Sequence, residues 1–316
     1  MMKVFEGLEF VHQIKNPVVT IGTFDGVHLG HQKIIQQLVK EAQNCNGESV
    51  LLTFHPHPRM VLNPENHQLQ LIQTQAEKLE KLAIYGLENV IIFPFTRAFA
   101  QLSALEFVKD ILVSKIGAKK IIIGYDHQFG NDRRGNIDFL KNHTTEFGYD
   151  VIEIPVKEVD EVNVSSTKIR NALLQGDIEM ANVYLNQPFE ITGIVTKGKQ
   201  LGRTIGFPTA NVNVQESTKL IPVNGVYAVK ISIEGGGNLN GMMNIGTRPT
   251  VSNEMQQSIE VNIFDFNEDI YDKSVKVSLF KHIRSEEKFP NLEALKTQIA
   301  KDEELIRAYF SATLVS

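Results

Sequence analysis

The chain has 316 residues, 42% of them hydrophobic, and its 32 basic and 37 acidic side chains give a formal net charge of −5. This composition favours two packed domains over a disordered chain, and the acidic balance disfavours a polynucleotide partner but not a local pocket for a small polyphosphate. The single cysteine, Cys45, cannot form an intrachain disulfide, which indicates a reducing compartment. Since we find neither an apolar run near 18 residues nor a secretory signal, we predict a cytoplasmic protein without a membrane partner.

The first part of the chain alternates apolar runs with helical patterns. The runs suit strands buried on both faces, and the first helical pattern has Ile34, Ile35, Leu38, Val39 and Ala42 on one face. This rhythm predicts an α/β domain with a doubly wound parallel sheet. The expected strands are 18–24, 49–54, 89–95, 119–124 and 150–156, and further helices are expected over 75–85, 104–116, 135–147 and 166–185.

The alternation of strand and helix patterns stops near Asn186-Gln187-Pro188. After this point, apolar runs follow one another with only turn residues between them. Such a pattern predicts a small antiparallel β-barrel. A C-terminal helix is expected after the barrel, with Asn291 as its N-cap. We therefore predict two domains, 1–185 and 186–316. The expected strands of the second domain are 189–195, 225–233, 239–246, 258–264 and 274–280.

The stretch TFDGVHLGH, residues 23–31, joins the first expected strand to the first helix. A helix start at the carboxyl end of a parallel strand attracts phosphate through free N–H groups and the helix dipole. His28 and His31, at i and i+3, lie on one side of that turn and can donate to phosphate oxygens. Two alternatives stand beside phosphate binding. The histidines can simply cap the helix, or they can ligate a metal together with His55 and His57.

The same stretch resembles the His-x-Gly-His signature of the nucleotidylyltransferase superfamily. Within it, GTFDGVHLGH is similar to the adenylyltransferase half of bacterial bifunctional riboflavin kinase/FAD synthetases. Three more segments fit in the same order: TFHPHP (53–58), IIIGYDHQFGNDRRG (121–135) and VSSTKIRNALLQGDIEMAN (164–182). The resemblance covers nearly the whole chain, with two departures. His127 stands where the family usually has phenylalanine, and Lys168 stands where arginine is common.

The resemblance implies that an FMN phosphate attacks the α-phosphorus of ATP and releases pyrophosphate. A phosphate monoester is already largely dianionic at neutral pH, so its attack needs no general base. His28 and His31 then serve as catalytic residues that neutralise the leaving pyrophosphate, and Asp25 shapes the turn. The implied nucleotide- and phosphate-binding residues are Gly22, Phe24, Asp25, Gly30, Ser165, Ser166, Thr167 and Arg170, and the implied flavin-binding residues are Phe54, His57, Pro58, Asp126 and Phe129. The roles of His55, Arg133 and Arg134 stay open.

The stretch GKQLGRTIGFPTANV, residues 198–212, is the most informative one in the second domain. It is not a Walker A loop, but its Thr209 and Asn211 offer hard oxygen ligands that suit Mg²⁺. It resembles the Gly-Phe-Pro-Thr-Ala-Asn motif of riboflavin kinases, which makes Thr209 and Asn211 the implied metal ligands and Glu260 the implied catalytic base. A solvent-facing glutamate is the bland alternative for Glu260. Further implied nucleotide-binding residues are Gly198, Arg203, Gly206 and Pro208. Arg248 and the terminal helix are expected to shape the flavin-side pocket, and Phe289 is expected to pack either on the isoalloxazine or on the barrel.

The sequence thus predicts a two-domain enzyme that phosphorylates riboflavin to FMN and then adenylylates FMN to FAD. Riboflavin, FMN, FAD, ATP, ADP and pyrophosphate are the expected substrates and products, with Mg²⁺ accompanying ATP; self-association stays open. Three rivals remain. They are a flavoprotein that only holds flavin, an adenylyltransferase with another acceptor, and a barrel-type nucleic-acid binder, which the acidic balance and the absence of tryptophan disfavour.

Overall fold

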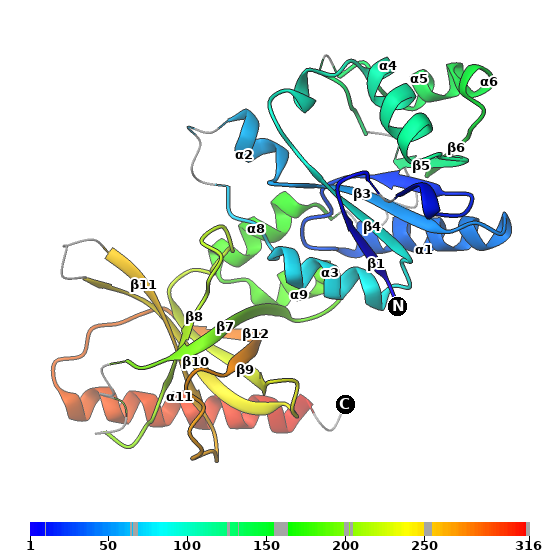
Figure 1. The fold of residues 1–316 in the computed structure, drawn as a ribbon. Coiled ribbons are helices and arrows are strands. Elements are labelled where there is room, and N and C mark those ends of the chain that lie inside the picture. Colours follow the sequence, from blue (N-terminus) through cyan, green and yellow to red (C-terminus); the bar gives the residue numbers. More distant parts are fainter. Residues whose placement is uncertain are drawn as a thin grey trace. The chain divides into compact units, whose positions relative to one another are not determined.

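The computed structural model describes residues 1–9, 11–63, 65, 69–124, 127–131, 133–154, 164–198, 202, 205–249 and 255–313. Its backbone divides into two compact units, Met1–Ser166 and Thr167–Ser316. The first unit is a parallel six-stranded sheet with helices around it, and the second contains a closed antiparallel barrel (Figure 1). Both architectures were predicted from the sequence. The predicted division at residue 186 is a separate matter and stays a prediction.

The sheet of the first unit has the strand order β1-β4-β3-β2-β5-β6, and every neighbouring pair is parallel. From β2 the chain passes to β3 and β4 on one side and later to β5 and β6 on the other. The strand order therefore reverses between β2 and β5, which is where ligands bind in sheets of this kind. The strands are β1 (Lys3–Glu6), β2 (Val18–Ile21), β3 (Ser49–His55), β4 (Asn89–Pro94), β5 (Lys120–Gly124) and β6 (Asp150–Ile154).

Helices cover both faces of this sheet, as the continuously apolar strands require. Val18 and Leu51 face a core shared with Ile35 and Leu38 of α1, whereas Val19 belongs to the opposite core. The helical elements are η1 (Val11–Gln13), α1 (Leu29–Asn44), α2 (Pro58–Leu62), α3 (Gln75–Ile84), η2 (Phe99–Gln101), α4 (Ala104–Glu106), the π-helical η3 (Phe107–Lys115), α5 (Ile137–Asn142) and α6 (Thr144–Phe147).

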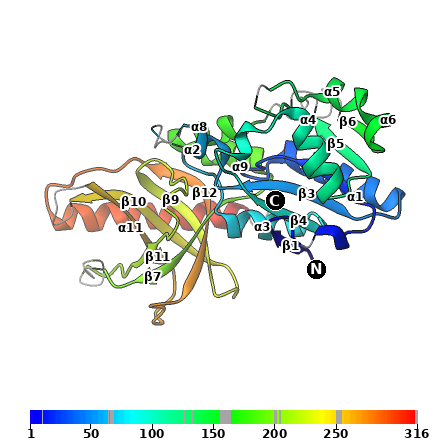
Figure 2. The same cartoon turned by 45° about the horizontal axis from the view of Figure 1, so that its top comes forward.

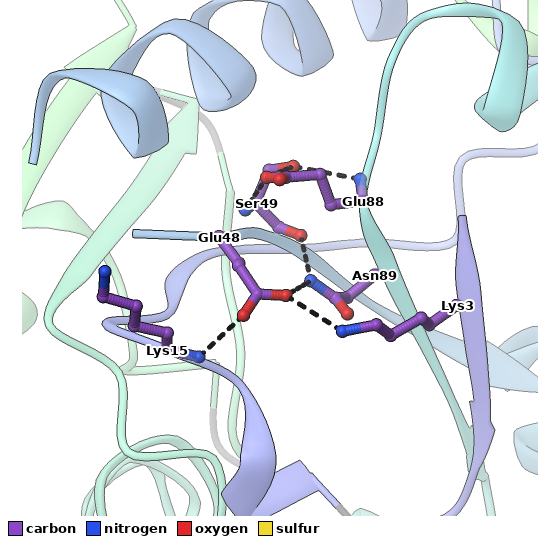
Figure 3. A network of polar contacts seen from close by, with 6 residues as sticks. All are labelled: Lys3, Lys15, Glu48, Ser49, Glu88 and Asn89. Atoms are coloured by element: carbon purple, nitrogen blue, oxygen red, sulfur yellow. Dashed lines mark hydrogen bonds and ion pairs between the residues drawn. The ribbon is translucent and has the colours of Figure 1, made fainter. Parts of the chain in front are cut away.

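A network of polar contacts lies at the amino ends of strands β1, β3 and β4 (Figure 3). The Glu48 carboxylate accepts hydrogen bonds from the Lys15 backbone N–H at 3.0 Å and the Asn89 amide at 3.1 Å, and Lys3 lies 3.4 Å away. These contacts lower the pKa of Glu48, and the hydrogen bond from the Lys15 N–H contributes most. Ser49 donates to Glu88 through both its backbone N–H and its hydroxyl. The network ties β1, β3 and β4 together at the edge opposite to their carboxyl ends.

The second unit opens with two helices and continues into the barrel, whose strand order is β10-β11-β8-β7-β12-β9. The long helix α11 lies along the outside of the barrel, where Ile306 and Phe310 pack on Val226, Ala228 and Met242 (Figure 2). Asn291 caps α11 as predicted, its side chain accepting from the Ala294 N–H at 2.9 Å. The elements are α8 (Ser166–Gln175), α9 (Ile178–Leu185), β7 (Phe189–Thr196), β8 (Ala210–Asn213), β9 (Gly225–Ile233), β10 (Leu239–Pro249), β11 (Met255–Ile263), β12 (Ser274–Arg284) and α11 (Leu292–Thr313).

Several predicted bounds were wrong, each for a local reason. The strand expected over 18–24 ends at Ile21, because the chain turns through a positive φ at Phe24. The helix expected over 166–185 is two helices, α8 and α9, interrupted where Gly176 has φ +80° and Asp177 caps α9. The helix expected over 135–147 is likewise divided at His143 into α5 and α6. The strands β1 and β8 and the short helix α2 were not expected.

Candidate active sites

The turn between β2 and α1 lies at the point where the strand order of the sheet reverses. Phe24 has φ +50° and Gly26 φ +92°, so the chain folds back sharply before α1 begins at Leu29. The Asp25 carboxylate is buried and accepts from the backbone N–H groups of Ile72, at 3.0 and 3.3 Å, and Gln73, at 3.4 Å. These bonds fix the turn from outside, as expected of a residue that shapes it. Binding of nucleotide by Asp25 stays a prediction.

His28 and His31 lie together at the start of α1, with their rings stacked at a centroid distance of 3.6 Å. His28 caps the helix, because its Nδ1 accepts from the His31 backbone N–H at 3.4 Å. Since Nδ1 is the acceptor in this bond, Nε2 is the ring nitrogen of His28 that can donate. The other face of His31 stacks on Phe24 at 4.5 Å. The helix-cap alternative is thus correct for His28, while both rings are more enclosed than solvated caps would be.

His31 has an unusual environment for a histidine. Burial, followed by the neighbouring His28 and Lys78, holds the pKa of His31 well below 6.5, so the ring is neutral at pH 7. Its Nδ1 is buried and has no hydrogen-bond partner within the described part of the chain. A buried polar atom without a partner is costly, so its presence calls for an explanation such as a bound ligand.

Two glycines allow this ring packing. A Cβ on Gly22 would lie 2.9 Å from the Phe24 ring, and one on Gly30 would lie 3.3 Å from the His28 ring. The second predicted phosphate segment begins beside the same turn, since the Ser166 hydroxyl donates to the Asp25 carbonyl at 2.9 Å. The structure therefore brings the two histidines and Ser166 to one turn. Ser165 directly precedes α8, and Thr167 and Arg170 lie further along this helix, in the second unit.

Lys78 is a further residue of this region, and it was not predicted. It lies on α3 with only 7% of its side chain exposed, and its Nζ donates to the Thr53 hydroxyl at 3.1 Å and the Thr23 carbonyl at 3.3 Å. Burial lowers the pKa of Lys78 to about 8, although the charge of Asp25 acts to raise it. One sequence signal was present: Lys78 precedes the core residue Leu82 by four positions and so shares its helix face.

Two of the predicted flavin-binding residues of the first unit, Phe54 and Phe129, belong to one series of contacting aromatic rings. Phe54 packs against Phe95 and Phe99, both at 5.6 Å, and Phe99 contacts Phe107, which in turn contacts Phe129 at 5.5 Å. Phe129 is buried in the core, so its ring is chiefly a packing element.

In the segment after β3, Pro58 is the first residue of α2 and His57 caps that helix. Proline is tolerated at this position because the first helical N–H has no partner within the helix. Asp126 lies outside the described residues.

The metal alternative for the histidines gains no support. The described residues contain no group of three or more His, Cys, Asp or Glu side chains that could hold a metal ion. His57 instead uses its Nδ1 to accept from the Arg59 N–H at 3.2 Å. The described residues thus give no support to the alternative in which His28, His31, His55 and His57 ligate a metal.

The barrel brings the predicted kinase residues together. Glu260 on β11 pairs with Asn211 on β8, and the Thr209 hydroxyl lies 3.4 Å from the Glu260 carboxylate. The buried Asn262, two positions along the same strand, donates to the Pro208 carbonyl at 2.7 Å and so holds the segment that carries Thr209. A carboxylate, a hydroxyl and an amide thus converge on one patch of the barrel.

Gly198 completes this patch. A Cβ at Gly198 would lie 2.2 Å from the Asn211 amide nitrogen and 2.6 Å from its Cγ, so any larger residue at this position would displace the Asn211 side chain. Gly206 has φ +90° in the turn before Pro208. Arg203 lies outside the described residues, as does the side chain of Arg248, whose backbone belongs to β10. Phe289, expected to pack on the flavin or on the barrel, has the Arg284 guanidinium 5.5 Å from the centre of its ring.

The fold and the two sites define a nucleotide-dependent transferase with one site in an α/β unit and another in a barrel. Comparison with known families agrees with this class. Residues 11–168 match the FAD synthetase family model and residues 185–310 match the riboflavin kinase model. None of the helices in the described part of the chain has the length and hydropathy needed to cross a membrane.

Similar proteins extend over the whole chain. The bifunctional riboflavin kinase/FMN adenylyltransferase of Buchnera aphidicola subsp. Schizaphis graminum is 39% identical, covering 98% of this chain and 99% of its own. The Escherichia coli K12 protein of the same name is 38% identical and covers 99% of each. A solved structure described as a macrolide-efflux protein from Streptococcus pneumoniae is 34% identical, with a TM-score of 0.87 over 97% of this chain and 98% of its own.

The chain belongs to the family of bifunctional riboflavin kinase/FMN adenylyltransferases. It is an enzyme of flavin-cofactor biosynthesis that forms FMN from riboflavin and FAD from FMN, with ATP as the co-substrate. The function and fold class predicted from the sequence are confirmed. The assignment of individual residues to each step is a separate question.

Proposed function

We propose that the chain phosphorylates riboflavin around Glu260 in the barrel and adenylylates FMN around His28 and His31 in the α/β unit. The observation that carries the proposal is the contrast between the two groups of side chains. The barrel patch places a carboxylate beside a hydroxyl and an amide, whereas the turn before α1 offers two stacked imidazoles and a serine. The two nucleophiles differ in a matching way. The riboflavin hydroxyl still carries its proton, whereas the FMN phosphate is already ionised.

In the kinase step the acceptor is the primary hydroxyl of riboflavin, which is neutral. As its oxygen forms a bond to the γ-phosphorus of ATP, the hydroxyl proton passes to the Glu260 carboxylate and ADP leaves. The Thr209 hydroxyl donates to that carboxylate at 3.4 Å and so fixes its orientation. Asn262 keeps Thr209 in register through the Pro208 carbonyl.

The donor set of the barrel patch fits Mg²⁺. Thr209 and Asn211 present a hydroxyl and an amide oxygen beside the Glu260 carboxylate, and Mg²⁺ prefers a few such oxygens together with waters and nucleotide phosphates. We assign Thr209 and Asn211 as the residues that hold it. When bound, the ion neutralises charge on the phosphates of ATP. Gly198, Arg203, Gly206 and Pro208 are assigned to the nucleotide.

In the adenylyl-transfer step an FMN phosphate oxygen forms a bond to the α-phosphorus of ATP while the bond to the pyrophosphate breaks. The phosphate is already charged, so the site needs hydrogen-bond donors and fixed positive potential rather than a base. His28 and the neutral His31 each supply one ring N–H, and the pyrophosphate charge favours protonation of His31 once it forms. The remaining residues assigned to the nucleotide are Gly22, Phe24, Asp25, Gly30, Ser165, Ser166, Thr167 and Arg170.

The residues assigned to the FMN of adenylyl transfer are Phe54, His57, Pro58, Asp126 and Phe129. Arg248 is assigned to the riboflavin of the kinase step. ATP and flavins as substrates favour the cytoplasm as the place of action. The acidic net charge of −5 makes small anions better candidate partners than polynucleotides. The number of chains that assemble stays open.

Two variants test the assignment. The protein is incubated with ATP and Mg²⁺, once with riboflavin and once with FMN, and the flavins are separated by chromatography. Glu260→Gln should lose FMN formation and keep FAD formation from supplied FMN, and His31→Ala should show the opposite pattern. If either substitution abolishes both activities in a folded protein, the separation of the two sites is wrong. A protein that only holds flavin would show no ATP-dependent conversion at all.

A further inference from the structure

The buried ammonium group of Lys78 lies next to the turn before α1, residues 22–28, called here the histidine turn. Neither of the proposed reaction steps uses this group. The Lys78 Nζ donates to the Thr53 hydroxyl and to the Thr23 carbonyl, and the Thr53 hydroxyl itself donates to the same carbonyl at 3.3 Å. These three groups close a small ring of hydrogen bonds between α3, β3 and the segment that follows β2. A neutral side chain could hold a carbonyl at a lower cost of burial, so the positive charge itself requires an explanation.

The ring of hydrogen bonds fixes the part of the turn that carries the histidine site. Thr23 directly precedes Phe24, whose ring stacks on His31, and Asp25 on the other side is bound to the Ile72 N–H just before α3. Both neighbours of Phe24 are therefore held by α3 and the residues that lead into it. Phe24 needs such support, because its φ of +50° is unfavourable for a residue with a large side chain.

The charge of Lys78 also acts on the site. It is one of the three causes that lower the pKa of His31, after burial and His28. Among the described residues, His28 at the start of α1 and Lys78 on α3 act on His31, and Asp25 in the turn acts on Lys78. The buried Glu77 on α3 is used by the helix cap at Thr74. A fixed cation next to a site that receives two phosphate-bearing anions, ATP and FMN, favours their binding.

We propose that Lys78 is a positioning residue for adenylyl transfer, whose buried ammonium holds the turn at Thr23 in the shape that stacks Phe24 on His31. The inference rests on the proposed role of His31 and extends it to a residue that touches neither substrate. Lys78 holds the backbone from below, while the imidazoles face the reacting phosphates. Its contribution is therefore specific to FAD formation and absent from FMN formation.

The test compares Lys78→Met with Lys40→Met in the full chain. Methionine keeps the length and apolar stem of lysine but removes the charge and the donors. Lys40 is exposed on α1 nine residues beyond His31, about 13 Å along the helix, where solvent and salt screen its charge. We expect Lys78→Met to lower kcat for FAD formation by about 100-fold, the usual effect of a misplacement of about 1 Å. FMN formation should be unchanged, and Lys40→Met should change neither activity.

A second measurement separates positioning from a general loss of structure. Imidazole proton resonances, followed from pH 4 to pH 8 and assigned with His31→Ala, should show the pKa of His31 rising in Lys78→Met and unchanged in Lys40→Met. An unchanged rate of FAD formation in Lys78→Met overturns the inference. So does a loss of FAD formation with an unmoved pKa of His31, because the effect would then not pass through the turn.

A third variant applies if Lys78→Met does not fold. Thr53→Val removes one acceptor from the ammonium and keeps the charge, and we expect it to lower the rate of FAD formation while FMN formation stays unchanged; an unchanged rate overturns the inference. The proposed function fails separately. If His31→Ala retains FAD formation, the role of the histidines is wrong, whereas if His31→Ala loses it and Lys78→Met does not, only the inference about Lys78 is wrong.

Discussion

The buried charge of Lys78 should cost stability, and its removal should recover part of that cost. The pKa of Lys78 falls from 10.5 to about 8, which corresponds to about 3 kcal/mol for keeping the ammonium charged in the folded protein at neutral pH. Lys78→Met removes this cost but also the hydrogen bonds to Thr23 and Thr53, each of which contributes about 1 kcal/mol. The Thr53 hydroxyl still donates to the Thr23 carbonyl. We therefore expect the variant to be as stable as the wild type at pH 7, or more stable by about 1 kcal/mol.

The pH dependence gives this prediction its sign. Because the folded pKa lies below the unfolded one, the unfolded chain binds more protons between pH 8 and pH 10.5, and the Lys78 contribution to stability rises with pH across that window. Below about pH 8 both states keep the proton and the contribution is constant. The difference in unfolding free energy, wild type minus Lys78→Met, should thus be flat from pH 6 to pH 8 and shift in favour of the wild type above pH 8.

The assay is urea unfolding followed by brief proteolysis at each urea concentration, with cleavage within residues 1–166 scored apart from cleavage in the barrel. Taking the difference between the two proteins cancels the titration of groups they share. A variant that loses several kcal/mol at pH 7 would refute the reasoning, because Lys78 would then stabilise the fold. A difference that stays flat up to pH 10 would refute it equally, because the ammonium would not be buried at a cost.

Two further predictions concern the two sites. Gly198→Ala should lower FMN formation by about 100-fold and leave FAD formation from FMN intact, since the new Cβ would lie 2.2 Å from the Asn211 amide; Gly237→Ala, where a Cβ meets nothing within 4 Å, is the matched control in the flavin assay. For His31 the folded pKa lies below 6.5, so the unfolded chain takes up the proton first as the pH falls. The unfolding free energy of residues 1–166 should fall as the pH drops below about 6.5 in the wild type, and His31→Gln should flatten that slope in urea unfolding from pH 5 to pH 7.5.

The fold was predictable where the burial of side chains sets the sequence pattern. Strands covered on both faces read as apolar runs, and α1 shows one apolar stripe, so both were found. The strand β1 was missed because it lies at the edge of the sheet and most of its residues are exposed. The strand β8 has only four residues, and it exists through its pairing with β7 and β11 rather than through its own composition. No local pattern records such pairing.

Parts of the two candidate sites were predictable where the residues concerned lie within a few positions of one another in one motif. His28 and His31 are three residues apart, and Thr209 and Asn211 are two apart, so their proximity follows from the chain itself. Lys78 lies 47 residues beyond His31, and a lysine on a helix is normally solvated. Its burial depends on α3 packing beside β3 and the turn after β2. The four-residue spacing to Leu82 was a hint, but it did not identify the carbonyl and hydroxyl that the ammonium meets.

The charges of the two sites follow from the protonation state of the two nucleophiles. An alcohol must lose a proton as it attacks, so under the proposed assignment the carboxylate of the barrel patch serves as its general base. A phosphate dianion has already lost its protons, so a carboxylate beside it would only repel it. The one carboxylate of the histidine turn, Asp25, is accordingly buried and bound to the backbone N–H groups of Ile72 and Gln73. Under the proposed assignment, the turn that receives anions is held by the buried ammonium of Lys78, whereas the kinase site presents the Glu260 carboxylate as its base.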